Sequence, residues 1–300
     1  MRHLTKLLDL SGDEILEILN LADKMKSDLK SGKEHKVLAG KTLAMIFSKA
    51  SSRTRVSFET GMYQLGGHAL FLSVNDLQIG RGEPVEDTAR VLSRYVDGIM
   101  IRTFEQQEVE DLAKWGTVPV INGLTDFAHP CQILADLMTI LEHKGTLEGL
   151  HMAYVGDGNN MCNSLIVGGL KCGLKVSVAV PKGYEPHADI LAFAADYSNF
   201  NLYNNPQEAV KNADIVTTDV WASMGQESEA IKRQKDFAAY QINHDLLSLA
   251  DSKAIVLHCL PAHRGEEISA EAFDAHANVI FDEAENRLHA QKAVMALLMG

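Results

Sequence analysis

Apolar residues in this chain form short runs that alternate with longer stretches in which they recur every three or four positions. Short runs bounded by turn residues indicate buried strands, and the three-to-four spacing indicates amphipathic helices. The runs predict strands at 42–47, 69–74, 98–103, 118–121, 151–156, 175–180, 200–204, 214–219, 254–259 and 278–281. The spaced stretches predict helices at 54–65, 84–96, 105–114, 130–143, 160–172, 187–197, 206–212, 241–250, 269–276 and about 283–299.

This alternation of strand and helix predicts parallel sheets covered by helices. An earlier helix is expected to begin after Ser11, because Glu14 completes a capping box, and to end near Gly32. A length of 300 residues suits two domains. We therefore expect an α/β protein with two domains, each a mostly parallel sheet flanked by helices. The boundaries expected are 1–145 and 146–282, with a C-terminal helix at 283–300 that packs back on the first domain.

Composition narrows the class of protein. A formal net charge of −12 and a pI near 5.4 argue against nucleic acid as the main partner. No apolar run approaches the roughly 18 residues of a membrane span, and the N-terminus does not read as a signal peptide. The four cysteines show no paired spacing, which is typical of reduced thiols. These features predict a cytoplasmic protein that binds neither nucleic acid nor membrane.

A basic, hydroxyl-rich cluster, Lys49 to Arg55, follows the strand at 42–47 and leads into a helix. Free backbone N–H groups and the positive end of the helix dipole make such a helix start an anion site. Ser51, Ser52 and Thr54 add hydroxyl donors, and the Arg53 guanidinium suits phosphate oxygens. The simpler alternative is a serine N-cap followed by solvated arginines. The cluster predicts a phosphate site.

Two further strand ends in the first half carry polar side chains. Arg102 closes an apolar strand, a costly position unless it faces an anion or an acid. His129 precedes Pro130, which suits the first position of a helix. His129 could then donate to a developing oxyanion, and Gln132 to a carbamoyl-like amide. A plain helix start is the alternative for this segment.

A glycine-rich turn, Gly156 to Asn160, opens the second half and invites a dinucleotide interpretation. That fingerprint requires a third glycine where Met161 stands, and an acid at the end of the next strand, which ends instead in Pro181-Lys182. A dinucleotide-dependent dehydrogenase is therefore a weaker candidate. The turn and its asparagines could instead hydrogen-bond a small zwitterion.

The strands predicted at 214–219 and 254–259 also end in residues that could bind a substrate. Asp219 offers an anion for a substrate ammonium group. Cys259 could be a core thiol or a polarizable contact beside a reacting centre. His258, Cys259 and His263 superficially suggest zinc, yet adjacent strand residues point to opposite faces. No metal and no cofactor are predicted.

Six motifs in this order make the chain resemble the ornithine carbamoyltransferase family over essentially its whole length. Ser51 to Arg55 reads Ser-Ser-Arg-Thr-Arg, where the family has Ser-Thr-Arg-Thr-Arg. The others are His-Pro-Cys-Gln at 129–132, Asp-Gly-Asn-Asn at 157–160, Asp-Val-Trp-Ala-Ser-Met-Gly at 219–225, His-Cys-Leu-Pro at 258–261 and Asp-Glu-Ala-Glu-Asn-Arg at 282–287.

The resemblance implies a carbamoyl phosphate-binding first domain, an ornithine-binding second domain, and a homotrimer with shared active sites. It implies that carbamoyl phosphate is held by Ser51, Ser52, Arg53, Thr54, Arg102, His129, Gln132 and Arg287, with Gln78 reaching the site of a neighbouring chain. It implies that ornithine is held by Asn160, Asp219, Ser223, Met224, Cys259 and Leu260. The residues expected to act in catalysis are Thr54, Arg102, His129 and Cys259.

The expected reaction transfers the carbamoyl group to the δ-amine of ornithine and gives citrulline and phosphate. Carbamoyltransferases for aspartate, putrescine or acetylornithine are the nearest alternatives. The aspartate relatives carry Pro or Gly where this chain has Cys259, and Asp219 suits a free α-ammonium group. A non-catalytic ornithine- or phosphate-binding protein on the same fold is a further alternative.

Overall fold

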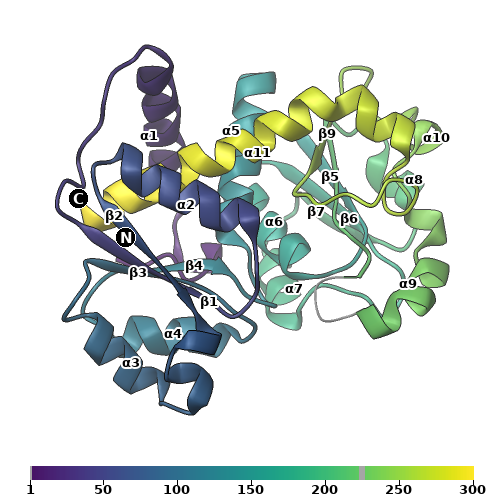
Figure 1. The fold of residues 1–300 in the computed structure, drawn as a ribbon. Coiled ribbons are helices and arrows are strands. Elements are labelled where there is room, and N and C mark those ends of the chain that lie inside the picture. Colours follow the sequence, from purple (N-terminus) through teal and green to yellow (C-terminus); the bar gives the residue numbers. More distant parts are fainter. Residues whose placement is uncertain (1, 223–226) are drawn as a thin grey trace. The chain divides into compact units, whose positions relative to one another are not determined.

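The computed structural model describes residues 2–222 and 227–300 (Figure 1). The chain divides into two compact units, of which the first ends at Met138 and also includes Glu285–Gly300. The second unit comprises Thr139–Ala284. Each unit contains one parallel sheet with helices packed on it, which confirms the predicted α/β class.

The first unit begins with an N-terminal helix and continues with alternating strands and helices. Its elements are η1 (Leu7–Asp9), α1 (Gly12–Lys30), β1 (Thr42–Phe47), α2 (Ser52–Gln64), β2 (His68–Ser73), η2 (Val74–Asp76), η3 (Ile79–Arg81), α3 (Val85–Leu92), β3 (Gly98–Arg102), α4 (Gln106–Trp115), β4 (Val120–Leu124) and α5 (Pro130–Lys144). The capping box predicted at the start of α1 is confirmed, because Ser11 accepts from the N–H of Glu14 while the Glu14 carboxylate accepts from the N–H of Ser11.

The second unit repeats the alternation with shorter helices. Its elements are β5 (His151–Val155), α6 (Asn160–Lys171), β6 (Lys175–Ala179), α7 (Ala188–Ala194), β7 (Phe200–Tyr203), α8 (Pro206–Val210), β8 (Ile215–Thr218), η4 (Glu227–Glu229), α9 (Ala230–Asp236), η5 (Ala238–Tyr240), α10 (His244–Leu247), β9 (Ile255–His258) and α11 (Ala270–Met299). The boundary between the units falls within α5 and again within α11.

All strands are parallel, but in each sheet there is one point from which successive strands are added on opposite sides, so that the strand order reverses there. The first sheet has the order β2-β1-β3-β4, so its order reverses between β1 and β3. The second has the order β7-β6-β5-β8-β9 and reverses between β5 and β8. Loops leave the carboxyl ends of the two strands toward opposite faces at such a point, and the crevice between them is where open parallel sheets bind ligands.

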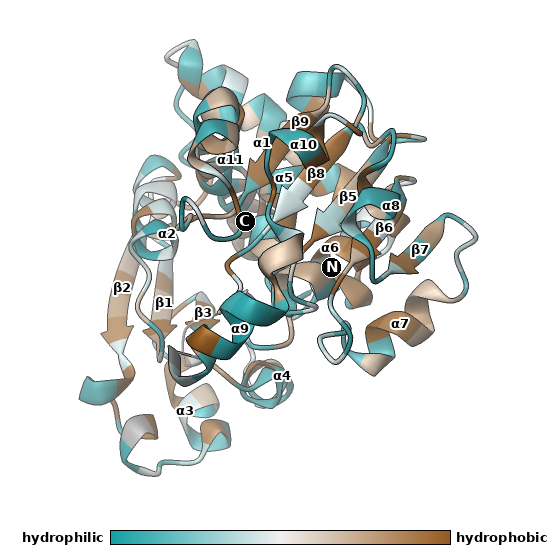
Figure 2. Cartoon of the chain, turned by 90° about the vertical axis from the view of Figure 1, so that its right-hand side faces the viewer, coloured by the Kyte–Doolittle hydropathy of each residue, from teal (hydrophilic) through white to brown (hydrophobic). Residues whose placement is uncertain are grey.

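The central strands β1, β3, β5 and β8 are buried, as covered parallel strands require, whereas the edge strands β2 and β7 are partly exposed. In the first unit, Ile46, Ile101 and Val120 pack with α4 residues Val109 and Leu112. Figure 1 shows α3 and α4 on this face of the sheet and α2 on the other. Brown, apolar stretches mark the strands of both sheets in Figure 2, with paler or teal stretches in strands such as β5 and β8.

The strand predicted at 278–281 is wrong. Residues 270–299 form one helix, which also begins well before the expected residue 283. The run Val279-Ile280-Phe281 is short and apolar, a pattern that suits a buried strand or a buried helix segment equally well. The helical period decides the outcome, because Phe273 and Ile280 lie seven residues apart in the same core while Phe281 is exposed.

The helix α9 was not predicted from the sequence. This helix has no apolar stripe, since Ile231 is exposed and Arg233 is its buried residue. Its anchor is electrostatic: the Arg233 guanidinium forms an ion pair with Asp157 at 2.7 Å. Hydrophobic periodicity cannot detect a helix that is held in this way.

Candidate functional site

The basic cluster lies at the reversal point of the first sheet. Phe47 pairs with Arg102 in the register of β1 and β3, and the N–H of Ser48 donates to the carbonyl of Arg102 at 2.8 Å. The loop that follows β1 therefore runs beside the end of β3. Sheet register thus brings Arg102 next to residues 48–54, about fifty residues earlier in the chain.

Ser51 caps α2, as the simpler alternative for this segment predicted. Its hydroxyl oxygen accepts from the N–H of Thr54 at 3.2 Å and its proton reaches the Thr54 hydroxyl at 3.1 Å. Thr54 is fully buried, whereas Ser52 is exposed. Ser51 and Thr54 are thereby held at the positive end of the helix dipole.

The cations of the cluster separate into distinct roles. Lys49 is buried, forms an ion pair with Asp126 and lies over the ring of Phe104. Arg55 is exposed and pairs with Glu59, one helical turn away, at 2.9 Å. Arg53 is half-buried, and its positive charge acts on His129. Of the three, Arg53 is the cation that faces the other predicted site residues.

His129 is a neutral imidazole among arginines. Its side chain is buried, and burial first, then the charges of Arg287, Arg102 and Arg53, hold its pKa well below 6.5. A neutral imidazole carries one N–H donor and one acceptor nitrogen. His129 can therefore donate a hydrogen bond near several fixed positive charges at neutral pH.

A hydrogen-bonded chain orients Gln132 and Arg287. The Gln132 amide donates to Asp136 at 2.8 Å, and its oxygen accepts from Arg287 at 2.7 Å. A second arm of the Arg287 guanidinium donates to the Thr54 hydroxyl at 3.4 Å. Gln132, Thr54 and Arg287 are all at most 3% exposed. Three segments predicted separately, around 54, 132 and 287, therefore meet in one buried polar cluster.

Cys131, between His129 and Gln132, is a core thiol. Burial raises its pKa to about 11, although the charge of Arg287 opposes the rise. Its sulfur donates to the carbonyl of Asn122 at 3.4 Å. Gln78 is exposed at the start of η3.

The second polar cluster lies at the reversal point of the second sheet. Asn159, which follows β5, donates through its side-chain amide to Asp219 at 2.8 Å. The Asn159 oxygen caps α6 by accepting from the N–H groups of Met161 and Cys162. Asp219 follows β8 directly, so the sheet order brings these two residues together.

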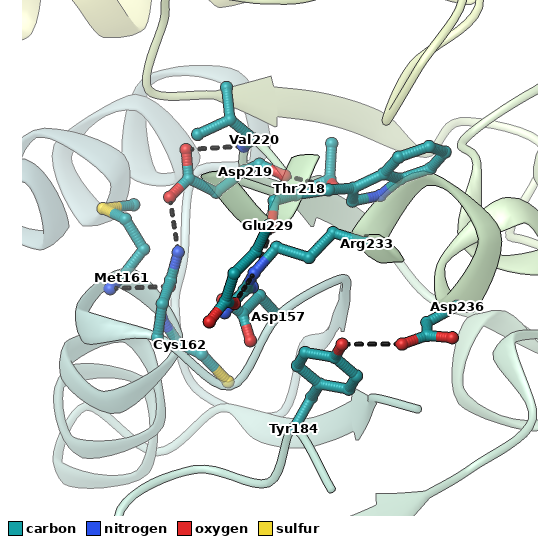
Figure 3. A network of polar contacts seen from close by, with 12 residues as sticks. Asp157, Met161, Cys162, Tyr184, Thr218, Asp219, Val220, Glu229, Arg233 and Asp236 are labelled. Carbon is teal, nitrogen blue, oxygen red and sulfur yellow. Dashed lines mark hydrogen bonds and ion pairs between the residues drawn. The ribbon is translucent and has the colours of Figure 1, made fainter. Parts of the chain in front are cut away.

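Asp219 is buried and already has several donors. Besides Asn159, its carboxylate accepts from the N–H of Val220 at 2.8 Å and from the thiol of Cys259 at 3.1 Å. Figure 3 shows Asp219 between Val220 and the start of α6. Cys259 is only partly buried, unlike the three other cysteines. The Asp219–Cys259 contact links two of the predicted substrate-binding residues directly.

The chain next to Cys259 has an unusual backbone. Leu260 has a φ of 58°, and the Leu260–Pro261 peptide bond is cis. The N–H of Leu260 donates to Nδ1 of His258, whose Nε2 lies 3.0 Å from the Glu267 carboxylate. Because Nδ1 accepts, Nε2 carries the proton, so a fully buried histidine–glutamate pair holds this segment.

Asp157 and Arg233 were not among the predicted site residues. The guanidinium of Arg233 bonds Asp157, Glu229 and the carbonyl of Trp221, as Figure 3 shows in part. Burial raises the pKa of Asp157, and the charge of Arg233 opposes the rise. No sequence signal pairs Asp157, which follows a strand, with Arg233, which lies far away along the chain.

The glycine-rich turn has a packing role. A Cβ on Gly158 would lie 2.4 Å from the backbone of residues 184–186, and the N–H of Gly158 donates to the carbonyl of Tyr184 at 2.9 Å. Only glycine permits so close an approach of two backbone segments. This close packing accounts for the glycine without any bound dinucleotide.

Asn160, the first residue of α6, is partly buried. Ser223 and Met224, two predicted ornithine-binding residues, lie outside the described residues. Within residues 2–222 and 227–300, one group of potential metal ligands is close enough to share an ion, at His263, Glu266 and Glu267. It differs from the His258–Cys259–His263 set considered from the sequence. Across the same two stretches, no helix has the length and apolar character needed to span a membrane.

Comparison with known families covers nearly the whole chain. Residues 2–142 match the family described as aspartate/ornithine carbamoyltransferase, carbamoyl-P binding domain. Residues 148–298 match aspartate/ornithine carbamoyltransferase, Asp/Orn binding domain. The two matched segments thus cover most of both compact units. The chain belongs to the aspartate/ornithine carbamoyltransferase family.

Individual relatives agree with this assignment. The chain is 57% identical to the ornithine carbamoyltransferase of Carboxydothermus hydrogenoformans, over 100% of this chain and 98% of that one. It is 55% identical to the anabolic ornithine carbamoyltransferase of Pyrococcus furiosus, over 100% and 96%. The solved structure of ornithine carbamoyltransferase from P. furiosus superposes with a TM-score of 0.96 at 56% identity, over 100% of this chain and 97% of that one.

Proposed function

We propose that this protein transfers the carbamoyl group of carbamoyl phosphate to the δ-amine of L-ornithine, giving L-citrulline and phosphate. The observation that carries the proposal is the cluster of neutral His129 with Arg53, Arg102 and Arg287, because it combines cationic groups with a neutral hydrogen-bond donor. The relatives named ornithine carbamoyltransferase support the choice of substrate. One relative is named anabolic, which favours the biosynthetic direction, toward arginine.

The first unit would bind carbamoyl phosphate. The phosphate would lie at the N-terminus of α2, against Ser51, Ser52, Arg53 and Thr54, where backbone N–H groups, hydroxyls and a guanidinium converge. Arg102, Arg287 and Gln132 would hold the carbamoyl end. Burial of Thr54 and Arg287 supports this placement, since water is largely excluded and each charge-assisted hydrogen bond is stronger there.

His129 would stabilise the developing negative charge on the carbamoyl oxygen. Attack by the amine pushes electrons onto that oxygen in the tetrahedral intermediate, and a fixed donor aimed at it lowers the barrier. Burial first, and then the charges of three guanidinium groups, disfavour a protonated His129 and lower its pKa. Arg102 and the hydroxyl of Thr54 would complete the set of groups around the oxygen.

The second unit would bind ornithine. Asp219 would attract the α-ammonium group, with Asn160, Ser223, Met224, Cys259 and Leu260 completing the site. The direct contact between Asp219 and the Cys259 thiol supports one shared site for these two residues. The free α-ammonium group is absent in acetylornithine and putrescine, so Asp219 favours ornithine over both.

The domain roles and the assembly are part of the same proposal. Residues 1–145 with 283–300 would form the carbamoyl phosphate-binding domain, and residues 146–282 the ornithine-binding domain. The matched family segments and the two compact units support this division. Gln78 is exposed, which suits a residue that completes the site of a neighbouring chain in a homotrimer. We place the protein in the cytoplasm, where its four cysteines would remain thiols.

A side-by-side assay tests the substrate assignment. Product formation from carbamoyl phosphate is measured with ornithine, putrescine, acetylornithine and aspartate at equal concentrations. Ornithine is expected to exceed each of the others by at least 100-fold in kcat/KM, because acetylornithine and putrescine lack the free α-ammonium group that Asp219 would bind, and aspartate lacks the δ-amine that would attack. Preference for any other amine would overturn the assignment, and binding without turnover would indicate a non-catalytic protein. Fluorescence titration with NADH separately tests the dehydrogenase alternative.

A further inference from the structure

Arg287, at the proposed carbamoyl phosphate site, is contacted in turn by other residues of α11 and α2. The C-terminal part of α11 lies along α2 (Figure 1). Besides the bond from Arg287 to Thr54, the contacts between the two helices include Gln291 to Ser57, Lys292 to Gln64, and the side chain of Met295 against Gly61. Gln291 differs from the residues that make the other contacts because it is also hydrogen-bonded to Arg287.

Gln291 connects two groups of the site through one amide. Its oxygen accepts from Nε of Arg287 at 2.8 Å, and its nitrogen donates to the Ser57 hydroxyl at 2.8 Å. Gln291 is fully buried. Arg287 and Gln291 are four residues apart on α11 and so share one face of the helix.

The hydrogen bonds around Gln291 permit only one orientation of its side-chain amide. The Ser57 hydroxyl donates to the carbonyl of Arg53 at 2.6 Å, one turn earlier in α2. Its proton is used there, so Ser57 accepts from Gln291 and must face the amide nitrogen. The amide oxygen then faces the Arg287 guanidinium, which carries only donors. Reversing the amide would set donor against donor at Arg287 and leave Ser57 without its buried partner.

We infer that Gln291 is a positioning residue for carbamoyl phosphate, acting through Arg287 and through the first turn of α2. Fixing Nε of Arg287 turns the two remaining arms of its guanidinium toward Gln132 and Thr54. Ser57 ties the same amide to the carbonyl of Arg53. One side chain thereby sets the distance between the arginine of α11 and the hydroxyls and backbone N–H groups of α2. This inference rests on the proposed function.

The isosteric variant Gln291→Met keeps the buried volume and removes both hydrogen bonds. Displacing a positioned group by about 1 Å can cost on the order of 100-fold. We expect the Kd of carbamoyl phosphate, measured by calorimetry, to rise about 10- to 100-fold. The KM of ornithine at saturating carbamoyl phosphate is expected to stay within about twofold, because Gln291 belongs to the first unit alone.

Two comparisons separate positioning from loss of stability. Met295→Ala removes packing between the same two helices without touching the hydrogen bonds, and is expected to lower Tm while leaving the Kd unchanged. Ser57→Ala should weaken carbamoyl phosphate binding, whereas Ser57→Thr, which keeps the hydroxyl, should restore it. The double variant Gln291→Met with Ser57→Ala should lose little more carbamoyl phosphate affinity than Gln291→Met alone, because the two residues belong to one series of hydrogen bonds.

Wild-type affinity in Gln291→Met would overturn the inference. So would an equal loss of affinity in Met295→Ala at matched Tm, or equal effects on carbamoyl phosphate and ornithine. If Gln291→Met does not fold, the Ser57→Ala and Ser57→Thr pair decides the question by itself. A wild-type protein that forms no citrulline would refute the proposed function. In that case the affinity for inorganic phosphate, compared between the wild type and Gln291→Met, would still test the role of Gln291.

Discussion

Replacing His129 tests the central feature of the proposed mechanism. His129→Ala removes the neutral donor that faces three guanidinium groups, and His129→Gln keeps an N–H donor of similar reach without an imidazole. Loss of one oxyanion donor typically costs about 100- to 1,000-fold in kcat, or about 2.7–4 kcal/mol. We expect a loss of this size for His129→Ala and a smaller one for His129→Gln, in a citrulline assay at saturating substrates.

The pH dependence of stability provides an independent measurement. The folded-state pKa of His129 lies well below its ordinary value of 6.5, chiefly because of burial. Below about pH 6.5 the unfolded chain therefore binds a proton that the folded chain does not, so this residue destabilises the fold as the pH falls. At pH 7.5 and above, both states are neutral and the effect disappears. The Tm of His129→Gln should accordingly fall less than that of the wild type between pH 7.5 and pH 5.5.

The same low pKa shapes the rate profile. His129 is neutral throughout the physiological range, so it should contribute no titration near pH 6.5. The attacking alkylamine has an ordinary pKa of about 10.4 and must be neutral, so activity is expected to rise with pH through the neutral range. A kcat within threefold of the wild type in His129→Ala would refute the role of the imidazole. An acid limb near pH 6.5 that vanishes in His129→Gln would refute its neutrality.

Three further changes test other parts of the site. Arg53→Ala should raise the Kd of carbamoyl phosphate by at least tenfold, since it removes a charge-assisted fork, and unchanged binding by calorimetry would count against the phosphate site. Asp219→Asn should raise the KM of ornithine by at least tenfold while sparing carbamoyl phosphate, and an equal loss of both substrates would break the division into two half-sites. Arg233→Leu should destabilise the protein by about 3–5 kcal/mol in urea unfolding, because it leaves Asp157 buried and unpaired. The double variant with Asp157→Leu should recover most of that loss, and a double variant as unstable as Arg233→Leu would contradict the explanation.

Local patterns predicted most of the fold. Nine strands were expected near their observed positions because buried parallel strands are short, apolar and β-branched, a signal carried by adjacent residues. The error at 278–281 has the same origin, since Val279-Ile280-Phe281 satisfies the strand pattern locally. Only the packing of Phe273 and Ile280 in one core reveals the helix. The missed helix α9 depends on an ion pair with Asp157, a residue far away in the sequence.

The amino-acid sequence by itself determined which residue types stand at the ends of strands: hydroxyls and arginine at 51–55, a histidine before a proline at 129–130, and an aspartate at 219. Those types follow from local chemistry, such as capping and the start of a helix, and they predicted the kind of site. Tertiary structure decided which of them meet. Strand order placed Arg102 beside the 48–54 loop and Asn159 against Asp219, and the packing of α11 brought Arg287 to Thr54 and Gln132. Burial among those arginines, which no local pattern encodes, is what keeps His129 neutral.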